Sequence, residues 1–510
     1  MQNGDNATGS NPPALFSDTQ ERRIVWLLCL LAAIHVFVFS AALPFFNNVD
    51  EQLHFDLVVK YSLGDLPRSL DAISVEALPY AALFGSPEFV GIPTNQPGGL
   101  IPPPPWRQPM DDVRQTLAAK TEAWHNVVNH EAAQPPLYYA IAGAWWRLGK
   151  LLGLHDGPLL YWLRFLNILL VSALVWLGYA AARLVFPERE WLHLGVPALL
   201  AFLPQTAFYS IQNDVLSPLC FGAAFLGLVQ WLRAGVPGVR LGALTGLALA
   251  ATFLTKISNL PLLFVSAGAV LCKIWSLAKA GKLRAAGPVL TALGLCAGLP
   301  MVAWLVWCKH SFGDFTGTAA KIQFLGWTHK PFSDWWSHPI FSPDGLWTFL
   351  SGLLATFWQG EILWHRQPLT LPVLNTIYTV VSIGLVGPTV AALLSRSMVA
   401  TAAQRQALWL GFGCLAATVA FLGFLSIIYD FHDCFYPSRE HPYFTSGRLM
   451  LGALIPFLLL LLFGLDRILG GVENNWLRPA VLAGMISFML LSEILTDWRL
   501  FPNAYNWFHM

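Results

Sequence analysis

Long apolar runs separated by short polar segments dominate the chain from residue 24 onward. The first run, Ile24 to Leu43, has about 20 residues, which is the length an α-helix needs to cross about 30 Å of hydrocarbon. By the same criterion we predict about eleven membrane-spanning helices. They are 24–43, 159–182, 192–211, 216–233, 240–255, 259–276, 286–307, 371–394, 407–428, 447–465 and 477–495.

With these eleven spans, the lysines and arginines of the short loops all fall on one side of the membrane. These residues are Arg22, Arg23, Arg183, Arg189, Arg233, Arg240, Lys273, Lys279, Lys282, Arg284, Arg396, Arg405, Arg467 and Arg478. Cytoplasmic loops carry an excess of Lys and Arg. We therefore expect the N-terminus to be cytoplasmic and the C-terminus to lie outside.

Residues 136–153 are apolar enough to resemble a further span. Counting them as one would invert every later loop and break the charge rule. We expect instead an amphipathic helix in the outer interface, with Trp145, Trp146, Arg147 and Lys150 at headgroup depth.

The predicted organisation therefore alternates bundles of spans with large outer loops. A disordered cytoplasmic tail (1–23) precedes the first helix (24–43), which leads into an outer loop (44–158) with interfacial helices and a Pro-rich segment (91–106). Helices 2–7 (159–307), an aromatic-rich outer loop (308–370), helices 8–11 (371–495) and an outer tail (496–510) complete the chain.

Composition agrees with an all-α polytopic membrane protein. Apolar residues make up 55% of the chain and charged residues 12%, whereas soluble domains carry about 25% charged residues. The mean hydropathy is +0.53. A net charge of +1 offers no electrostatic footprint for nucleic acid.

Asp50 and Glu51 follow the first predicted span, with His54 one turn later. A helix over 51–63 would place Asp50 and His54 on one face. Two interpretations of the acidic pair remain open. Asp50 caps an interfacial helix with Glu51 in its first turn, or it serves as a general base at the membrane surface.

Three further charged residues lie at the outer ends of predicted spans. Asp214 precedes the fourth span and either caps it or faces the same cavity as Asp50. Lys256 and Arg448 either snorkel to headgroups or bind the phosphate of an anionic lipid, Arg448 at a helix N-terminus after Gly447. A shared outer cavity for Asp50, Lys256 and Arg448 is the hypothesis these positions suggest.

Two weaker groups of candidates remain. His432, Asp433 and His441 could ligate a divalent ion, although their spacing matches no closed metal motif. Tyr138 and Tyr139 either line a sugar pocket or anchor the interfacial helix.

The order of these motifs resembles the GT-C superfamily of polytopic glycosyltransferases, which includes protein O-mannosyltransferases and aminoarabinose transferases. It is most similar to a poorly characterised bacterial GT-C-like family with motifs Pro-Asp-Glu-x-x-His-Phe, His-Pro-Pro-Leu-Tyr-Tyr, Asn-Asp-Ala and Gln-Gly-Arg-Tyr. This chain departs from them at Asn48-Val49, at Gln134 and at Ser446-Gly447-Arg448-Leu449.

The resemblance implies transfer of a sugar from a polyprenyl-phosphate donor to an unidentified acceptor at the extracytoplasmic face of a bacterial inner membrane. Asp50, with Glu51 second, would be the base, and His54, Asp214, Lys256, Arg448, Tyr138 and Tyr139 would bind substrate. A divalent metal ion is a possible cofactor. A transporter of lipid-linked sugars and a non-catalytic lipid-binding scaffold are the alternatives.

Overall fold

A computed structural model describes residues 17–87, 102–364, 367–395, 401–434, 437–470 and 476–510. The expected tail (1–23) and the Pro-rich segment (91–106) lie largely outside the described residues. The described chain is almost entirely helical, which confirms the all-α polytopic fold class.

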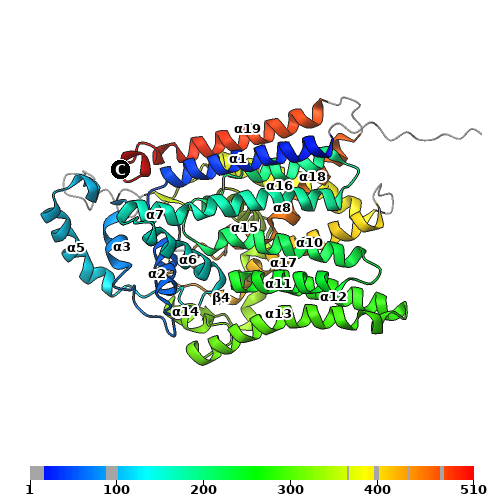
Figure 1. Cartoon of the computed structure of the whole chain (residues 1–510), viewed down its shortest axis with the longest axis horizontal. Coiled ribbons are helices and arrows are strands. Elements are labelled where there is room, and N and C mark those ends of the chain that lie inside the picture. The colour runs from blue at the N-terminus through cyan, green and yellow to red at the C-terminus, as the bar shows by residue number, and fades with distance from the viewer. Residues whose placement is uncertain (1–16, 88–101, 365–366, 396–400, 435–436, 471–475) are drawn as a thin grey trace, which may run out of the picture.

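Long helices such as α1, α8, α13 and α19 run roughly along the long axis of the molecule (Figure 1). The helices of the described chain follow in sequence order. They are α1 (Asp18–Ala42), α2 (Glu51–Leu63), α3 (Leu78–Phe84), α5 (Met110–His125), α6 (Leu137–Leu151), α7 (Asp156–Arg164), α8 (Leu166–Val185), α9 (Glu190–Ala201), α10 (Ser217–Arg233), α11 (Val239–Thr255), α12 (Leu260–Lys279), α13 (Leu283–Phe312), α14 (Thr318–Phe324), α15 (Pro343–Gln359), α16 (Pro372–Leu394), α17 (Ala402–Ile428), α18 (Leu454–Leu469) and α19 (Leu477–Asp497).

Short 3₁₀ turns and strands connect the helices. The turns are η3 (Pro105–Arg107), η4 (Thr206–Phe208), η5 (Asn213–Leu216), η6 (Ile257–Asn259), η7 (Phe332–Ser337), η8 (Pro339–Phe341), η9 (Gly447–Ala453), η10 (Trp498–Leu500) and η11 (Trp507–His509). Strand β1 (Thr328–His329) pairs antiparallel with β4 (Tyr429–Asp430), and β2 (Leu363–Trp364) pairs antiparallel with β3 (Gln367–Pro368).

Nine helical segments within the described residues are long and apolar enough to cross a membrane. Each corresponds to one of the predicted spans. The predicted span 240–255 is the shorter apolar helix α11. The predicted span 192–211 is helical only to Ala201, and its remainder is irregular chain with the turn η4.

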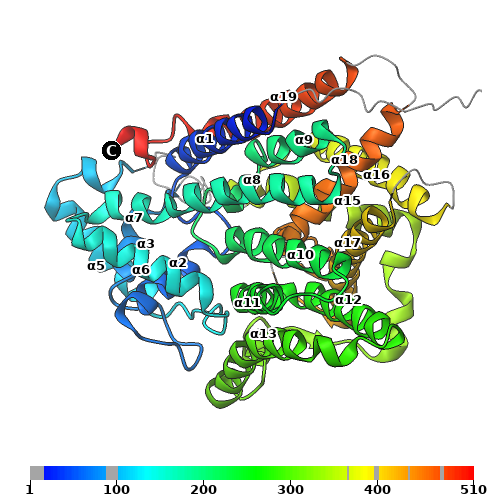
Figure 2. The ribbon, with the colours of Figure 1, turned by 45° about the vertical axis from the view of Figure 1, so that its right-hand side comes forward.

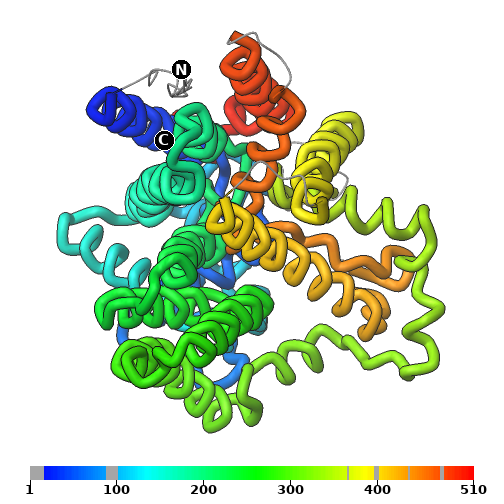
Figure 3. Tube along the Cα trace, turned by 90° about the vertical axis from the view of Figure 1, so that its right-hand side faces the viewer, coloured from blue at the N-terminus to red at the C-terminus, as the bar shows by residue number. Residues whose placement is uncertain are grey.

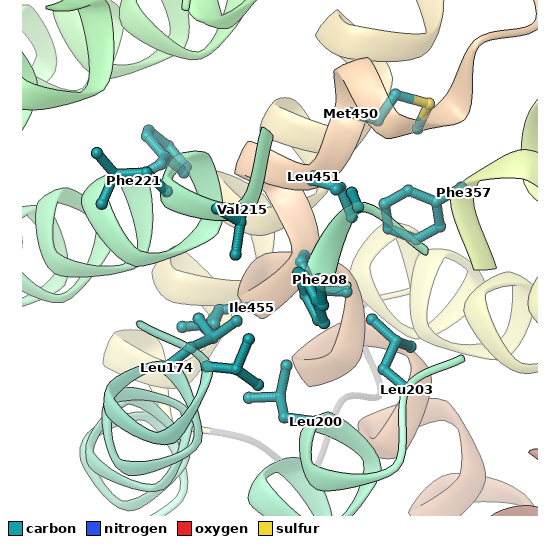
Figure 4. Packing of buried hydrophobic residues seen from close by; sticks show 14 of the residues in the cluster. Leu174, Leu200, Leu203, Phe208, Val215, Phe221, Phe357, Met450, Leu451 and Ile455 are labelled. Atoms are coloured by element: carbon teal, nitrogen blue, oxygen red, sulfur yellow. The ribbon is translucent and has the colours of Figure 1, made fainter. Parts of the chain in front are cut away.

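The irregular part of that segment is buried inside the bundle. Phe208 lies with Leu200, Leu203, Val215 and Leu451 in one apolar cluster (Figure 4). Non-helical backbone at membrane depth is tolerated where protein surrounds it. The hydropathy of residues 192–211 therefore indicated correctly that this segment is buried, but it did not indicate that the helix ends at Ala201.

Helices α1 and α19 lie along one long side of the bundle and α13 along the opposite side (Figures 1 and 2). Helices α2, α3, α5, α6, α7 and α14 gather at one end (Figure 1). Seen along the bundle, the segment between α14 and α15 reaches away from the helices and returns beside the chain that follows α17 (Figure 3). The β1–β4 pairing joins these two segments.

The predicted helices 51–63 and 136–153 form as α2 and α6, and α6 is absent from the candidate spans among the described residues. The two pack closely, because a Cβ on Gly143 would lie 2.9 Å from the backbone nitrogen of Ser62. The expected headgroup position of Trp146 is wrong: its side chain is fully buried against Phe55 and Tyr80.

Candidate functional site

Asp50 sits in a left-handed backbone conformation (φ 62°, ψ 10°) directly before α2. Asp and Asn tolerate this region better than other non-glycine residues, and such strain concentrates at functional sites. Its side chain makes no capping hydrogen bond to α2. The helix-cap interpretation of Asp50 is therefore wrong, and its carboxylate is available to other partners.

Arg448 is the centre of the site. Its guanidinium donates from Nη2 to Asp50 Oδ2 (3.3 Å), from Nη1 to Asp214 Oδ2 (3.1 Å) and from Nε to Glu361 Oε2 (2.8 Å). Nη1 also reaches the Gln212 side-chain oxygen at 3.3 Å. Only about a tenth of the side chain is exposed, so snorkelling to headgroups does not describe it.

The position of Arg448 depends on the glycine before it. Gly447 opens η9 against α15, where a Cβ would lie 2.3 Å from both Leu353 O and Phe357 N. Because no side chain separates the two backbones, the Gly447 N–H donates to Thr356 Oγ1 at 2.8 Å. A close approach of the η9 and α15 backbones at Gly447 therefore sets where Arg448 begins.

Lys256 and Asp214 form a buried ion pair. Lys256 Nζ lies 2.7 Å from both carboxylate oxygens of Asp214, and both side chains are almost fully enclosed. Snorkelling is therefore wrong for Lys256 as well. Asp214 bridges the two cations, since its Oδ2 also accepts from Arg448.

Glu361 enters the site through an unusual turn after α15. Gly360 has φ +81°, and a Cβ there would lie 2.0 Å from Thr206 Oγ1. Because Gly360 has no side chain, the chain can approach Thr206 closely, and the Glu361 N–H donates to Thr206 Oγ1 at 3.1 Å. The Glu361 carboxylate then accepts from Arg448 and, at 2.9 Å, from the Ser446 hydroxyl.

His130 and Glu131 come from a loop held on α2. Asn129 anchors this loop by donating to Leu53 O (3.0 Å) and Asp56 Oδ2 (2.8 Å). His130 Nε2 lies 3.5 Å from Asp50 Oδ1. Glu131 is paired with Lys321 of α14.

These contacts make one ion network, which we call the Arg448 cluster. Its members are Asp50, His130, Glu131, Asp214, Lys256, Lys321, Glu361 and Arg448. Lys321, Asp50 and His130 are its most exposed members, with 29%, 21% and 18% of their side chains accessible. They therefore form the face that a substrate can reach.

Burial and neighbouring charges shift the pKa values of the carboxyl groups in the Arg448 cluster. Burial alone would raise the pKa of the Asp50 carboxyl, but the contact with His130 and the charge of Arg448 outweigh it and hold that pKa well below its usual range. Lys321 does the same for the pKa of Glu131. Burial raises the pKa of Glu361.

Three of these groups could hold a metal ion. One ligand atom each from Asp50, His130 and Glu131 lie within 4.8 Å of one another, the one such group found in the described part of the chain. Carboxylate oxygens and an imidazole nitrogen are suitable ligands for Mn²⁺ or Zn²⁺. The donor set and its partial exposure fit a divalent cation.

Four residues expected in the site lie outside this network. Glu51 is fully buried and bound to Arg164, with Nη2 to Oε1 at 2.8 Å, and it accepts the N–H groups of Phe46 and Ile211. His54 bonds Tyr139 through Nδ1 at 2.7 Å, and burial lowers the pKa of its imidazole to about 4. Tyr138 and Tyr139 are completely enclosed, so neither anchors α6 at the membrane surface.

The second group of metal candidates does not converge. His432 Nε2 contacts Thr328 Oγ1 at 2.6 Å, while Asp433 and His441 are exposed. These three residues are not among the metal-ligand groups of the described residues. The structure thus places the metal-compatible group at Asp50 instead.

The sequence contained signals for part of what was missed. His130 and Glu131 stand four and three residues before the Gln134-Pro135-Pro136 motif, and Glu361 interrupts an apolar, aromatic run. Lys321 carries no such signal, since only the folding of α14 against the loop of Glu131 brings it to the site.

Fold and site together define a polytopic membrane protein with a buried charged network at one end of its helical bundle. The chain belongs to the family described as "Predicted membrane protein (DUF2142)", whose profile matches residues 34–313. No curated protein matches the sequence.

Three solved structures show similar helix arrangements at low identity. An oligosaccharyltransferase from Archaeoglobus fulgidus, in complex with Zn and sulfate, has TM-score 0.45 and 10% identity over 92% of this chain and 53% of its own. AglB from the same organism, in complex with an inhibitory peptide and a dolichol-phosphate, has TM-score 0.42 and 11% identity over 96% and 56%. ArnT from Cupriavidus metallidurans, bound to undecaprenyl phosphate, has TM-score 0.33 and 13% identity over 88% and 79%.

The chain therefore spans about half the length of the two archaeal enzymes. At these identities and TM-scores the likeness carries no conclusion about this chain.

Proposed function

We propose that this protein is a membrane glycosyltransferase that moves a sugar from a polyprenyl-phosphate donor to an acceptor at the extracytoplasmic face. The convergence of Asp50, Asp214, Lys256 and Arg448 in one ion network carries the proposal. These residues come from four distant parts of the chain, and their motif order is the one that resembles GT-C enzymes.

The chemistry requires a base for the acceptor hydroxyl and positive charge for the leaving phosphate. The acceptor oxygen attacks the anomeric carbon while the bond from that carbon to the phosphate oxygen breaks. The hydroxyl proton passes to Asp50, and polyprenyl phosphate leaves with the bonding electrons.

Arg448 links the two halves of this reaction. The Arg448 guanidinium is shared among three carboxylates, which keeps Asp50 ionised but weakly basic. A donor phosphate that draws Arg448 away would remove this stabilising charge and raise the basicity of Asp50. Donor binding would thus prepare the base for the acceptor.

The balance of charge favours a divalent cation in addition. With every carboxylate ionised, Asp50, Glu131, Asp214 and Glu361 outnumber the cations Lys256, Lys321 and Arg448 by one. A phosphate would add further negative charge. Asp50, His130 and Glu131 would hold the cation, which would supply the missing positive charge beside the leaving group. A cation bound to Asp50 would lower the basicity of this carboxylate, so in the metal-bound protein Asp50 would act as a ligand and not as the base.

The decisive experiment is Asp50→Asn in purified full-length protein supplied with polyprenyl-phosphate sugars and candidate acceptors. We expect transfer to fall by about 10²–10⁴-fold, the usual contribution of a general base. Asp111→Asn is the matched control, because Asp111 lies on α5 with 86% of its side chain exposed. Activity should also fall with EDTA and recover with MnCl₂.

Near-normal transfer by a folded Asp50→Asn protein would remove Asp50 from the mechanism. Transfer that is unaffected by EDTA would remove the metal and leave the base in place.

A flippase for lipid-linked sugars is the second candidate, because the segment after α9 is broken and buried, a feature that transporters use. Proteoliposomes loaded with a fluorescent polyprenyl-phosphate sugar separate the two. Movement of the lipid between leaflets without any glycosylated product would favour the flippase.

A further inference from the structure

A hollow of about 370 Å³ lies between the loop after α2, the end of α13 and α14, the helix that carries Lys321 of the Arg448 cluster. Three segments line it: the loop after α2, the end of α13, and α14. The side chains that matter here are Ser69, Leu70, Ser311, Phe312, Gln323 and Phe324. Its size is at the small end of the range of about 300–1,000 Å³ for ligand pockets.

Helix α14 connects this hollow to the Arg448 cluster. The ring of Phe324 stacks on His130, with centroids 5.7 Å apart and planes inclined by 23°. Lys321, one turn earlier on α14, pairs with Glu131. Since His130 in turn contacts Asp50, a ligand in the hollow is separated from the proposed base by two aromatic rings.

The lining has a consistent chemical character. Ser69 and Gln323 offer neutral hydrogen-bonding groups, whereas the Ser311 hydroxyl oxygen is enclosed by protein. Phe312 and Phe324 add aromatic surface, whose negative face favours contact with weakly positive C–H groups. No lining residue is ionisable, so a charged ligand would gain no ion pair there.

We propose that the hollow between α13 and α14 binds an uncharged sugar ring, held by hydrogen bonds to Ser69 and Gln323 and by contact with Phe324. The inference rests on the proposed function in one respect only: the ring belongs either to the donor lipid or to a saccharide acceptor. In both cases the neutral carbohydrate lies across the Phe324 and His130 rings from Asp50.

A binding measurement that needs no turnover tests this proposal. Full-length protein in nanodiscs is titrated with the methyl glycosides of mannose, glucose and arabinose, with glucuronic acid as the charged comparison, and followed by saturation-transfer NMR. We expect at least one neutral glycoside to bind, and Phe324→Ala to weaken it by about fivefold, the loss of roughly 1 kcal/mol of aromatic contact.

Phe315→Ala is the matched control. Phe315 lies in the turn between α13 and α14, is 58% exposed and does not line the hollow. Gln323→Ala provides a second variant and should also weaken binding. The proposal is overturned if no neutral glycoside binds, if glucuronic acid binds as well, or if Phe315→Ala has the same effect as Phe324→Ala.

The two possible sources of the sugar are separated in the transfer assay. A higher KM for the acceptor in Phe324→Ala assigns the hollow to the acceptor, and a higher KM for the polyprenyl-phosphate sugar assigns it to the donor. Glycoside binding that persists in a protein without transfer activity would overturn the proposed function and leave the sugar site standing.

Discussion

Two adjacent carboxylates at the start of α2 have opposite roles. The left-handed backbone at Asp50 turns its side chain toward His130 and Arg448, where it stays partly exposed. Glu51 is the first residue of the helix and points into the protein, where Arg164 and two backbone N–H groups satisfy it completely. The Asp50 carboxylate is therefore accessible to a ligand, whereas the Glu51 carboxylate is enclosed and contributes to the stability of the fold.

We therefore expect Glu51→Gln to destabilise the fold, because it leaves the Arg164 charge buried without its partner. Loss of one member of a fully buried ion pair costs about 3–5 kcal/mol. Thermal unfolding in detergent and the yield of monodisperse protein measure this effect. Asp50→Asn serves as the comparison and should retain near-normal stability; equal losses in the two variants would contradict the division of roles.

His54 illustrates how position along a helix can mislead. It lies one turn from Asp50, yet its Nδ1 bonds Tyr139 and its Nε2 has no partner among the described residues. With burial lowering its pKa to about 4, the imidazole is neutral at physiological pH. His130, 80 residues away, is the histidine that contacts Asp50.

At the scale of elements, the crossing of η9 over α15 places Arg448. The backbones approach closely because position 447 has no side chain, and Thr356 accepts the Gly447 N–H. Helix α15 ends at Gln359, and the positive φ of the next residue, Gly360, directs Glu361 toward Arg448. Two glycines thus set the geometry of one arginine.

Gly447→Ala should therefore force η9 away from α15. Overpacking of this kind costs about 1–3 kcal/mol, and the displaced Arg448 should lower transfer activity as well. Thermal unfolding and the transfer assay report the two effects. Gly384→Ala in α16 is the control, because a Cβ there meets nothing within 4 Å; if both variants behaved alike, the close approach would not matter.

At the scale of the whole molecule, α2, α5 and α14 gather at one end of the bundle (Figure 1). Asp50 directly precedes α2, and α14 contributes Lys321 to the Arg448 cluster and Phe324 to the hollow. The loop between α12 and α13 lies at the other end (Figure 1). The charge rule predicts that the first end faces outward and the second faces the cytoplasm.

Cysteine labelling tests this orientation. In a background whose native cysteines are replaced by alanine, Asp111→Cys should react with a membrane-impermeant maleimide in intact cells. Lys282→Cys, also at an exposed position, should react only after the membrane is permeabilised. The reverse pattern would place the proposed active site in the cytoplasm and remove access to an external acceptor.

The local pattern of the chain was sufficient for most of the secondary structure. Runs of about 20 apolar residues predicted eleven spans, and nine of these are long apolar helices in the described residues, because a membrane requires such helices. Helix α2 begins and ends at the predicted residues 51 and 63. Local pattern could not reveal the break at Ala201, because a buried irregular segment is as apolar as a helix.

The candidate site divides in the same way. The sequence by itself determined that Asp50, Asp214, Lys256 and Arg448 would stand at the ends of apolar helices, since hydrocarbon excludes charge from their middles. Only the tertiary structure decided which charges meet: Lys321 and Glu361 join the Arg448 cluster, whereas Glu51 is withdrawn to Arg164. Ion pairing acts between atoms a few ångströms apart, and only the fold brings residues hundreds of positions apart to that distance.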